Sequence, residues 1–344
     1  MKAEKFDFGT TRAGESVDGI RISNGKGLEM ALISYGATLT SLKMSDRAGN
    51  LEECLLGFAS IGEYEKQEAY MGATIGRVCN RIGKGSYILD GREYMLSIND
   101  QGCNHLHGGI KGFDKVIWHM EPVQEVGKSG VRCTYLSRDG KEGYPGNLEV
   151  EVIYWLTVGN ELIMEFNAVT DRRTPVNLTN HAYWNLSGNC RESIHNHHLQ
   201  IEAESYLPVD EWSIPTGEIR NVEGTPFDFR TLKQIGPALD KTGGYDHNFV
   251  LSDSRKESAE NRILLEHKKS GRAMEIRTTE PGVQFYSGNF LGDLKIGNFN
   301  NHDALCLETQ MYPDSVNKSH FPPVILSPGE TYRQVTVHNF FLIE

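Results

Sequence analysis

One histidine of the sequence lies among alternating polar side chains, in the segment PVNLTNHAYWNLSG at residues 175–188. If this segment is a β-strand, its polar face carries His181 between Thr179 and Tyr183, because successive side chains point to opposite sides. An imidazole exchanges a proton near neutral pH. The segment therefore predicts either a core histidine or a proton-transfer group, with Asn177 and Thr179 as candidates to fix the orientation of the ring.

A glutamate lies inside the apolar segment ALCLETQMYPD. Burying an unpaired carboxylate costs several kcal/mol, roughly, so Glu308 is expected to form an ion pair, to face a cleft, or to act chemically. Burial would also raise the pKa of Glu308 toward neutrality, as a general base needs. Strand alternation places three further side chains on the face of Glu308, namely Cys306, Gln310 and Tyr312.

The motif NHLHGG holds two histidines, His105 and His107, which would point the same way on a strand. Such a pair can bind a metal, but a metal needs several ligands in a defined geometry, and the following GGIKGFD supplies no glutamate. The sequence therefore predicts no metal site. The HNHH run at residues 195–198 is expected to be a solvated loop.

Three further motifs offer polar groups to a ligand. Asn80 and Arg81 are adjacent in IGRVCNRIGKG, where the arginine is either a surface residue or a bidentate donor to hydroxyls or carboxylates. Asp246 in GYDHNF is a turn residue or a ligand contact, and Gln284 shares a strand face with Tyr286 in GVQFYSGN. Hydrogen-bonding groups beside aromatic rings suit a polyhydroxylated ligand, so these residues point to a sugar.

The bulk properties exclude several classes of protein. A net charge of −11, spread along the chain without basic blocks, argues against nucleic acid or a membrane surface as a partner. The sequence holds no Gly-x-Ser-x-Gly, Walker or His-Glu-x-x-His motif, which removes the serine hydrolase, P-loop and zincin readings. Six scattered cysteines and an N-terminal MKAEKFDFG without an apolar run predict a cytoplasmic protein.

The element pattern predicts an all-β fold. EVEVIYWLTV at residues 149–158 and ELIMEFNAVT at residues 161–170 are predicted to be strands joined by a two-residue turn, Gly159-Asn160. SYIL, Asp-Gly and REYML from residue 86 form a second hairpin of this kind. No linker or repeat interrupts the chain, so residues 1–344 are expected to form one domain with long loops that rim a cleft.

Helical signals are few. EYEKQEAYMG near residues 63–72 is one candidate, and FRTLKQIGPAL near residues 229–239 is another. In the second, Gly236-Pro237 is expected to end the helix early.

The chain resembles the aldose 1-epimerase (galactose mutarotase) family. The resemblance rests on motifs that occur in the family's order along nearly the whole chain, which makes it more specific than any single motif. They are GRVCNRIGKG, NHLHGGIKGFDK, EGYPG, PVNLTNHAYWNLSG, YLPVD, IPTGE, YDHNF, PGVQFYSGNF and LETQMYPDSVN. The sequence departs from the family pattern at Cys79 and Trp184.

The resemblance implies a large antiparallel β-sandwich that binds a monosaccharide in an open cleft without a cofactor. It implies that His181 is the acid that protonates the ring oxygen and that Glu308 is the base at the C1 hydroxyl, with His107 assisting. Sugar hydroxyls are expected to be held by Arg81, Asp246, Gln284 and Asn80. The chain is expected to be a monomer or a homodimer.

Three other functions remain open from the sequence. A non-catalytic sugar-binding protein would keep the cleft but not both the acid and the base. A hexose-phosphate 1-epimerase would add a cationic pocket, to which Arg172, Arg173 or Lys84 could contribute. A glycosidase would use two carboxylates, Asp246 and Glu308, but would leave the histidines unexplained.

Overall fold

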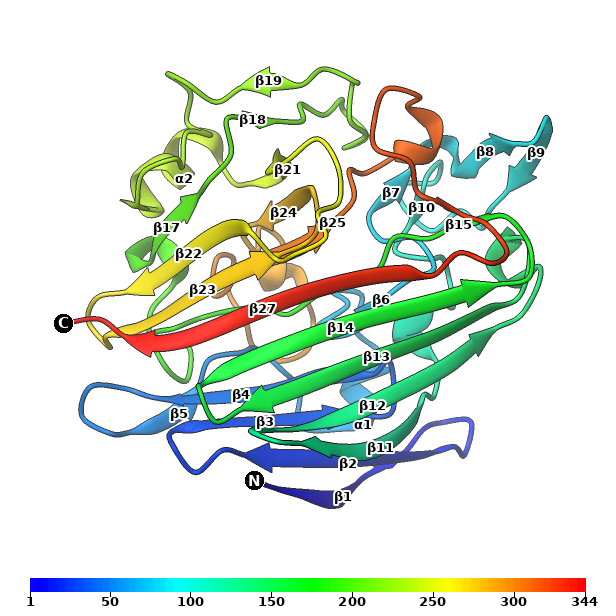
Figure 1. Cartoon of the computed structure of the whole chain (residues 1–344). Helices are drawn as coiled ribbons and strands as arrows, with labels where there is room; N and C mark the ends of the chain where they lie inside the picture. The colour runs from blue at the N-terminus through cyan, green and yellow to red at the C-terminus, as the bar shows by residue number, and fades with distance from the viewer.

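The computed structural model describes all residues from 1 to 344 and is built mainly of antiparallel sheets (Figure 1). The largest sheet has nine strands. In spatial order they are β11 (His119–Glu125), β12 (Lys128–Ser137), β13 (Leu148–Thr157), β14 (Glu161–Thr170), β27 (Tyr332–Leu342), β23 (Arg272–Thr278), β22 (Asn261–His267), β17 (His198–Ile201) and β20 (Lys233–Gln234). The predicted all-β class is confirmed.

Two five-stranded sheets pack against this large sheet. One comprises β1 (Lys2–Thr10), β2 (Ser16–Ser23), β3 (Leu28–Ile33), β4 (Thr38–Ser45) and β5 (Leu51–Glu53). The other has the order β19 (Arg220–Asn221), β18 (Ser205–Tyr206), β21 (Asp246–Val250), β24 (Gly282–Tyr286) and β25 (Cys306–Gln310). Figure 1 shows the first sheet, in blue, at the bottom of the view, below β13 and β14.

Short two-stranded pairs connect the sheets. They are β6 (Thr74–Ile75) with β16 (Thr179–Asn180), β7 (Arg81–Ile82) with β10 (His105–Leu106), β8 (Ser86–Leu89) with β9 (Arg92–Met95), and β15 (Thr174–Pro175) with β26 (Ile325–Leu326). Single 3₁₀ turns cover Gly83–Gly85, Phe113–Lys115, Lys141–Gly143, Ile194–Asn196, Leu291–Asp293 and Ser315–Asn317. None of the helices has the length and apolar character that a membrane span requires.

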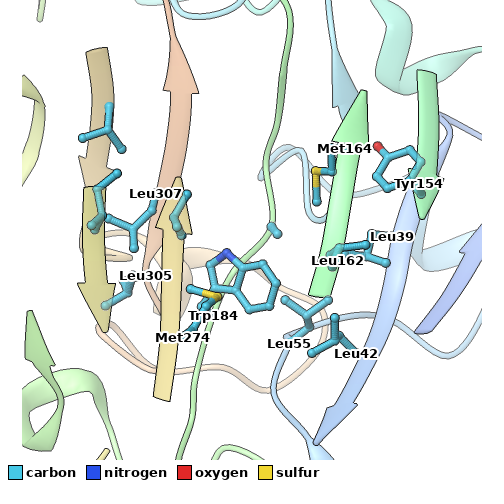
Figure 2. Close-up of a cluster of buried hydrophobic side chains, with 14 of the residues drawn as sticks. Leu39, Leu42, Leu55, Tyr154, Leu162, Met164, Trp184, Met274, Leu305 and Leu307 are labelled. Carbon is cyan, nitrogen blue, oxygen red and sulfur yellow. The ribbon is translucent and has the colours of Figure 1, made fainter. Parts of the chain in front are cut away.

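The largest cluster of the hydrophobic core lies between these sheets and comprises 53 buried residues. Strand β14 contributes every second side chain to it, among them Leu162 and Met164, as the strand period requires. Figure 2 shows these side chains facing Leu39 and Leu55, with Trp184 between them and the strands that carry Met274 and Leu307. Each fully buried leucine contributes about 1.5–3 kcal/mol, so this packing fixes the scaffold from which the cleft loops extend.

Both predicted hairpins are confirmed. β13 and β14 pair in continuous register from Leu148↔Thr170 to Leu156↔Leu162, and the turn between them occupies residues 158–160. The β8–β9 turn places Asp90 and Gly91 at φ of 53° and 74°, the left-handed region that a tight hairpin turn needs.

The predicted helices are mostly wrong. Near residues 63–72 only α1 (Ile61–Tyr64) forms, a single turn with a Ser60–Glu63 capping box. The second helix, α2 (Gly236–Thr242), begins where Gly236-Pro237 was expected to end it. Proline is favoured in a first helical turn, because its missing N–H has no helical partner there.

Two expectations about histidine-bearing segments are also corrected. Within residues 175–188 only Thr179–Asn180 is a strand beyond the first residue, so the predicted long alternation does not form. The HNHH run is not simply solvated, because His197 is fully buried and its Nε2 accepts a hydrogen bond from the Leu186 N–H at 2.8 Å.

Candidate active site

An open cleft of about 330 Å³ lies where β25, β21 and the loops after β6, β10 and β16 converge. Six of the seven sequence-predicted site residues line it, namely Asn80, Arg81, His107, His181, Asp246 and Glu308. The seventh, Gln284, is buried and does not line the cleft. Segments that are far apart in the chain therefore supply one set of polar groups.

Strand pairing within one sheet fixes the positions of Glu308 and Asp246. Glu308 on β25 lies opposite Gln284 on β24, and Asp246 on β21 lies opposite Tyr286. His181 follows β16 directly, where its backbone N–H donates to the Ala73 carbonyl at 2.9 Å. The side chains are thus held by backbone hydrogen bonds on both sides of the cleft.

His181 and Glu308 form a buried acid–base pair, with Nε2 of His181 3.6 Å from Oε1 of Glu308. Burial lowers the pKa of His181 to about 4. Burial and the charge of Asp246 raise the pKa of Glu308 well above its ordinary value, although Arg81 opposes this effect. The other oxygen of Glu308, Oε2, has no hydrogen-bond partner. In the protein alone these directions favour a single proton on the pair, carried by the carboxyl group.

His107 is held as a hydrogen-bond donor. Its Nδ1 accepts a hydrogen bond from the backbone N–H of Asn80 at 3.1 Å, so the neutral ring carries its proton on Nε2. Burial and the neighbouring His181 lower the pKa of His107 well below its ordinary value, which keeps the ring neutral. Its ring packs 5.2 Å from that of His181 and 4.5 Å from that of Tyr70.

The donor atoms of His107, His181 and Glu308 all lie within 4.8 Å of one another, close enough for a metal ion. A ligating histidine needs a free lone pair, but Nδ1 of His107 already accepts from Asn80. Its Nε2 is then protonated and has no lone pair to offer. These residues therefore do not fit a bound metal.

The predicted pairing of His105 with His107 is wrong. Strand β10 ends at Leu106, and His107 takes a φ of 52°, which breaks the alternation. His105 lies outside the cleft, with Nε2 bonded to the Tyr144 hydroxyl and Nδ1 to the Ser97 carbonyl, each at 2.7 Å.

Arg81 and Asp246 are fixed by a chain of polar contacts. Arg81 Nε donates to Asp100 at 3.1 Å, and its Nη1 lies 3.5 Å from Oδ2 of Asp246. The other oxygen of Asp246, Oδ1, accepts from Nε2 of Gln284 at 2.7 Å. Gln284 thus orients Asp246, while its own Oε1 has no hydrogen-bond partner in the structure.

The residues expected to orient His181 do not contact it. The Asn177 side chain bonds to the backbone of Met311 in both directions, and the Thr179 hydroxyl is buried without a partner. The side chain beside Nδ1 of His181 is Cys306, whose Sγ lies at 3.5 Å.

Sequence reasoning missed the aromatic wall and the acidic rim of the cleft. The wall is made by Tyr70, Tyr183, Tyr286 and Phe290, and the rim by Glu68 and Asp293. The alternation of GVQFYSGN marks Tyr286 and that of the His181 segment marks Tyr183, but no spacing marks the others. The two departures from the family pattern, Cys79 and Trp184, do not line the cleft.

Comparison with known proteins gives a consistent result. The family model for aldose 1-epimerase matches residues 18–339. Galactose mutarotases of Bos taurus and Homo sapiens are each 48% identical over 319 residues, covering 91% of this chain and 91% of each relative. The aldose 1-epimerase of Escherichia coli K12 is 39% identical over 335 residues, covering 93% of this chain and 94% of that protein.

Solved structures agree in fold. An aldose epimerase homologue from C. elegans superposes with a TM-score of 0.86 at 32% identity, covering 94% of this chain and 98% of its own. A galactose 1-epimerase from Lactobacillus acidophilus superposes with a TM-score of 0.88 at 29% identity, covering 100% of this chain and 99% of its own.

Proposed function

This chain belongs to the aldose 1-epimerase family and is an aldose 1-epimerase, and we propose that His181 and Glu308 carry its proton transfers. The substrates proposed are free aldohexoses such as D-galactose and D-glucose, whose α and β anomers are interconverted. The observation that carries the proposal is the buried pair itself, with Nε2 of His181 3.6 Å from Oε1 of Glu308 on the cleft.

The reaction needs one base and one acid at the anomeric centre. Glu308 takes the proton of the C1 hydroxyl while His181 gives a proton to the ring oxygen, and the bond between C1 and the ring oxygen breaks. The aldehyde rotates about the C1–C2 bond and presents its other face. The same residues then reverse their roles to close the ring, so the enzyme returns to its starting state without a cofactor.

The protonation of the pair matches this cycle. Ring opening starts from an imidazolium and a carboxylate and ends with a neutral imidazole and a carboxylic acid. Both states hold one proton, so the pair acts as a coupled unit whose two arrangements must be close in energy. Burial favours the uncharged arrangement, which makes the imidazolium of His181 a strong acid toward the ring oxygen.

The other cleft residues are proposed to bind the sugar. His107 donates from Nε2 to a substrate oxygen, while Asn80, Arg81 and Asp246 hold ring hydroxyls. Gln284 acts through Asp246, as their 2.7 Å hydrogen bond supports. Apolar faces of the pyranose pack against the aromatic wall, a common arrangement for amphipathic ligands.

A neutral substrate is favoured over a sugar phosphate. Besides Glu308, the cleft is lined by three acidic side chains, those of Glu68, Asp246 and Asp293, against one guanidinium, that of Arg81. Arg81 is already paired with Asp100 and Asp246, so it offers little free charge to a phosphate.

The cations suggested for a phosphate pocket lie elsewhere. Arg173 pairs with Asp90, Arg172 donates to the Tyr94 hydroxyl, and Lys84 lines a separate surface pocket. A glycosidase is also disfavoured, since Asp246 is engaged by Arg81 and Gln284 and is not free to act as an acid.

We further propose one domain over residues 1–344, supported by the largest core cluster, whose members come from Ile20 to Phe340. All six cysteines are free thiols, which fits a reducing, cytoplasmic setting. A monomer or a homodimer is proposed because one chain supplies every cleft residue.

Polarimetry of freshly dissolved α-D-galactose and α-D-glucose tests the activity directly. Relaxation to the anomeric equilibrium that is faster with the protein than in buffer is expected for at least one sugar. If both sugars relaxed at the same rate with the protein as in buffer, the assignment of free aldohexoses as substrates would be contradicted.

A further inference from the structure

We propose that Cys306 is a positioning residue for His181. Its sulfur accepts a hydrogen bond from the Nδ1–H group of His181 throughout the reaction cycle. Nε2 is then the only ring atom of His181 that exchanges a proton. This inference rests on the proposed function, because it concerns how the acid of that reaction is prepared.

Strand β25 supplies the side chains that lie beside both ring nitrogens of His181. Cys306 and Glu308 alternate on β25 and therefore point to the same side. The Sγ atom of Cys306 lies 3.5 Å from Nδ1 of His181, and Oε1 of Glu308 lies 3.6 Å from Nε2. Cys306 is fully buried and does not line the cleft, so water does not compete for Nδ1, whereas Nε2 faces the cleft beside Glu308.

The antiparallel register explains this arrangement. Trp184 and Leu305 form a bridge, with mutual backbone hydrogen bonds of 2.7 and 3.1 Å. Following the two chains from that bridge brings Tyr183 opposite Cys306 and His181 opposite Glu308. The imidazole therefore lies across the strand from the thiol and the carboxyl group.

Other titratable groups surround the ring but do not replace the sulfur. Rings pack against it from three segments, at centroid distances of 5.9, 5.2 and 5.1 Å for Tyr70, His107 and Tyr183. Asp246 on β21 adds a negative charge nearby. None of these side chains forms a hydrogen bond with Nδ1 in the structure, whereas Cys306 does.

A thiol suits this position because it is a weak acceptor. Burial and the neighbouring Glu308 raise the pKa of Cys306 well above its ordinary value, so the group stays a neutral thiol rather than a thiolate. A weak, neutral acceptor fixes the tautomer of His181 but stabilises the imidazolium less than an oxygen would. The acid that protonates the ring oxygen therefore remains strong.

The test compares Cys306→Ser with Cys306→Ala in the full chain. Serine offers a stronger acceptor, which stabilises the imidazolium, so the acid limb of the kcat/KM profile is expected to move upward by about half a pH unit. Alanine removes the acceptor, and kcat is expected to fall about tenfold with little change in KM. Cys133→Ala is the matched control, since Cys133 is equally buried but has no side-chain hydrogen bond in the structure.

A second readout does not depend on activity. The ¹⁵N chemical shifts of His181 at neutral pH are expected to report a proton on Nδ1 in the wild type and in Cys306→Ser, and mixed tautomers in Cys306→Ala. If both variants kept the wild-type tautomer of His181 and the wild-type acid limb of kcat/KM, the proposed role of Cys306 would be overturned. If His181→Gln kept full activity, the proposed function itself would fail, whichever tautomer the spectra reported.

Discussion

Nε2 of His181 lies 3.6 Å from Oε1 of Glu308, and only 6% and 3% of the two side chains are exposed to solvent. The distance is too long for a good hydrogen bond and short enough for strong electrostatic coupling. A sugar that inserts its C1 and ring oxygens beside these atoms can exchange protons with both. This geometry supports the proposed exchange of protons between the pair and a substrate.

The pH dependence of kcat/KM should reflect this pair. Burial lowers the pKa of His181 to about 4, so the doubly protonated, inactive pair forms only in acid. The value of kcat/KM is expected to stay high at pH values well below 6.5, the ordinary pKa of histidine. It should fall only in an acid limb centred near pH 4. Polarimetric rates across this range measure the limb, and a limb centred near 6.5 would contradict the proposed environment of His181.

Gln284 should affect binding more than chemistry. Gln284→Met removes the 2.7 Å hydrogen bond to Asp246 while keeping a side chain of similar length. KM is expected to rise about tenfold, the value of one lost hydrogen bond, with kcat changed by less than about threefold. A large loss in kcat at unchanged KM would instead place Gln284 in the proton-transfer step.

Sugar phosphates should be poor substrates because the cleft is acidic. At low ionic strength, kcat/KM for D-galactose 6-phosphate is expected to be at least about tenfold below that for D-galactose, and salt should reduce the gap by screening. The double substitution Glu68→Gln and Asp293→Asn, which neutralises the acidic rim, should also reduce the difference in kcat/KM between the two sugars. Equal rates for the two sugars in the wild type would contradict the preference for neutral substrates.

Asp114 should weaken the fold at alkaline pH. Both of its carboxylate oxygens are buried without partners, and burial raises its pKa to about 7. The folded state thus keeps a proton that the unfolded state releases near pH 4, so stability falls as the pH rises from about 4 to 7. Above pH 7 the cost reaches about 4 kcal/mol.

Asp114→Asn removes this titration. The variant is expected to gain stability over the wild type at pH 8, and this gain should be about 3 kcal/mol smaller at pH 5, as measured by urea unfolding. Asp18→Asn, a change at an exposed aspartate, serves as the control and should shift neither value. A variant with no stability gain at pH 8 would show that Asp114 is not buried as a free acid.

The sequence predicted the site better than it predicted the elements. Long hairpins such as β13–β14 were legible because alternation and turn residues are local signals. α2 was misjudged because Gly236-Pro237 is compatible with either end of a helix, and tertiary packing decides between them. Collinear motifs identified Arg81, Asp246 and Glu308, since binding groups recur as types at fixed places in the chain.

The contacts between segments could not be read from the sequence. Asn177 and Thr179 were neighbours of His181 in the predicted strand, but the partner of the ring is Cys306, brought there by the Trp184–Leu305 bridge. The hydrogen bond that Gln284 donates to Asp246 could not be read from the sequence either. Such relationships depend on the register between distant strands, which no local pattern encodes.

The most direct test of the account compares His181→Gln, Glu308→Gln and the double variant in their rates of α-D-galactose mutarotation. Glu266→Gln, which changes a buried glutamate on β22 outside the cleft, controls for the loss of a buried charge. Each single variant is expected to lose about 10²- to 10⁴-fold in kcat, and the double variant to be no slower than the worse single one, because the pair acts as a unit. A single variant with near wild-type turnover, or losses that multiply in the double variant, would contradict the shared-proton mechanism.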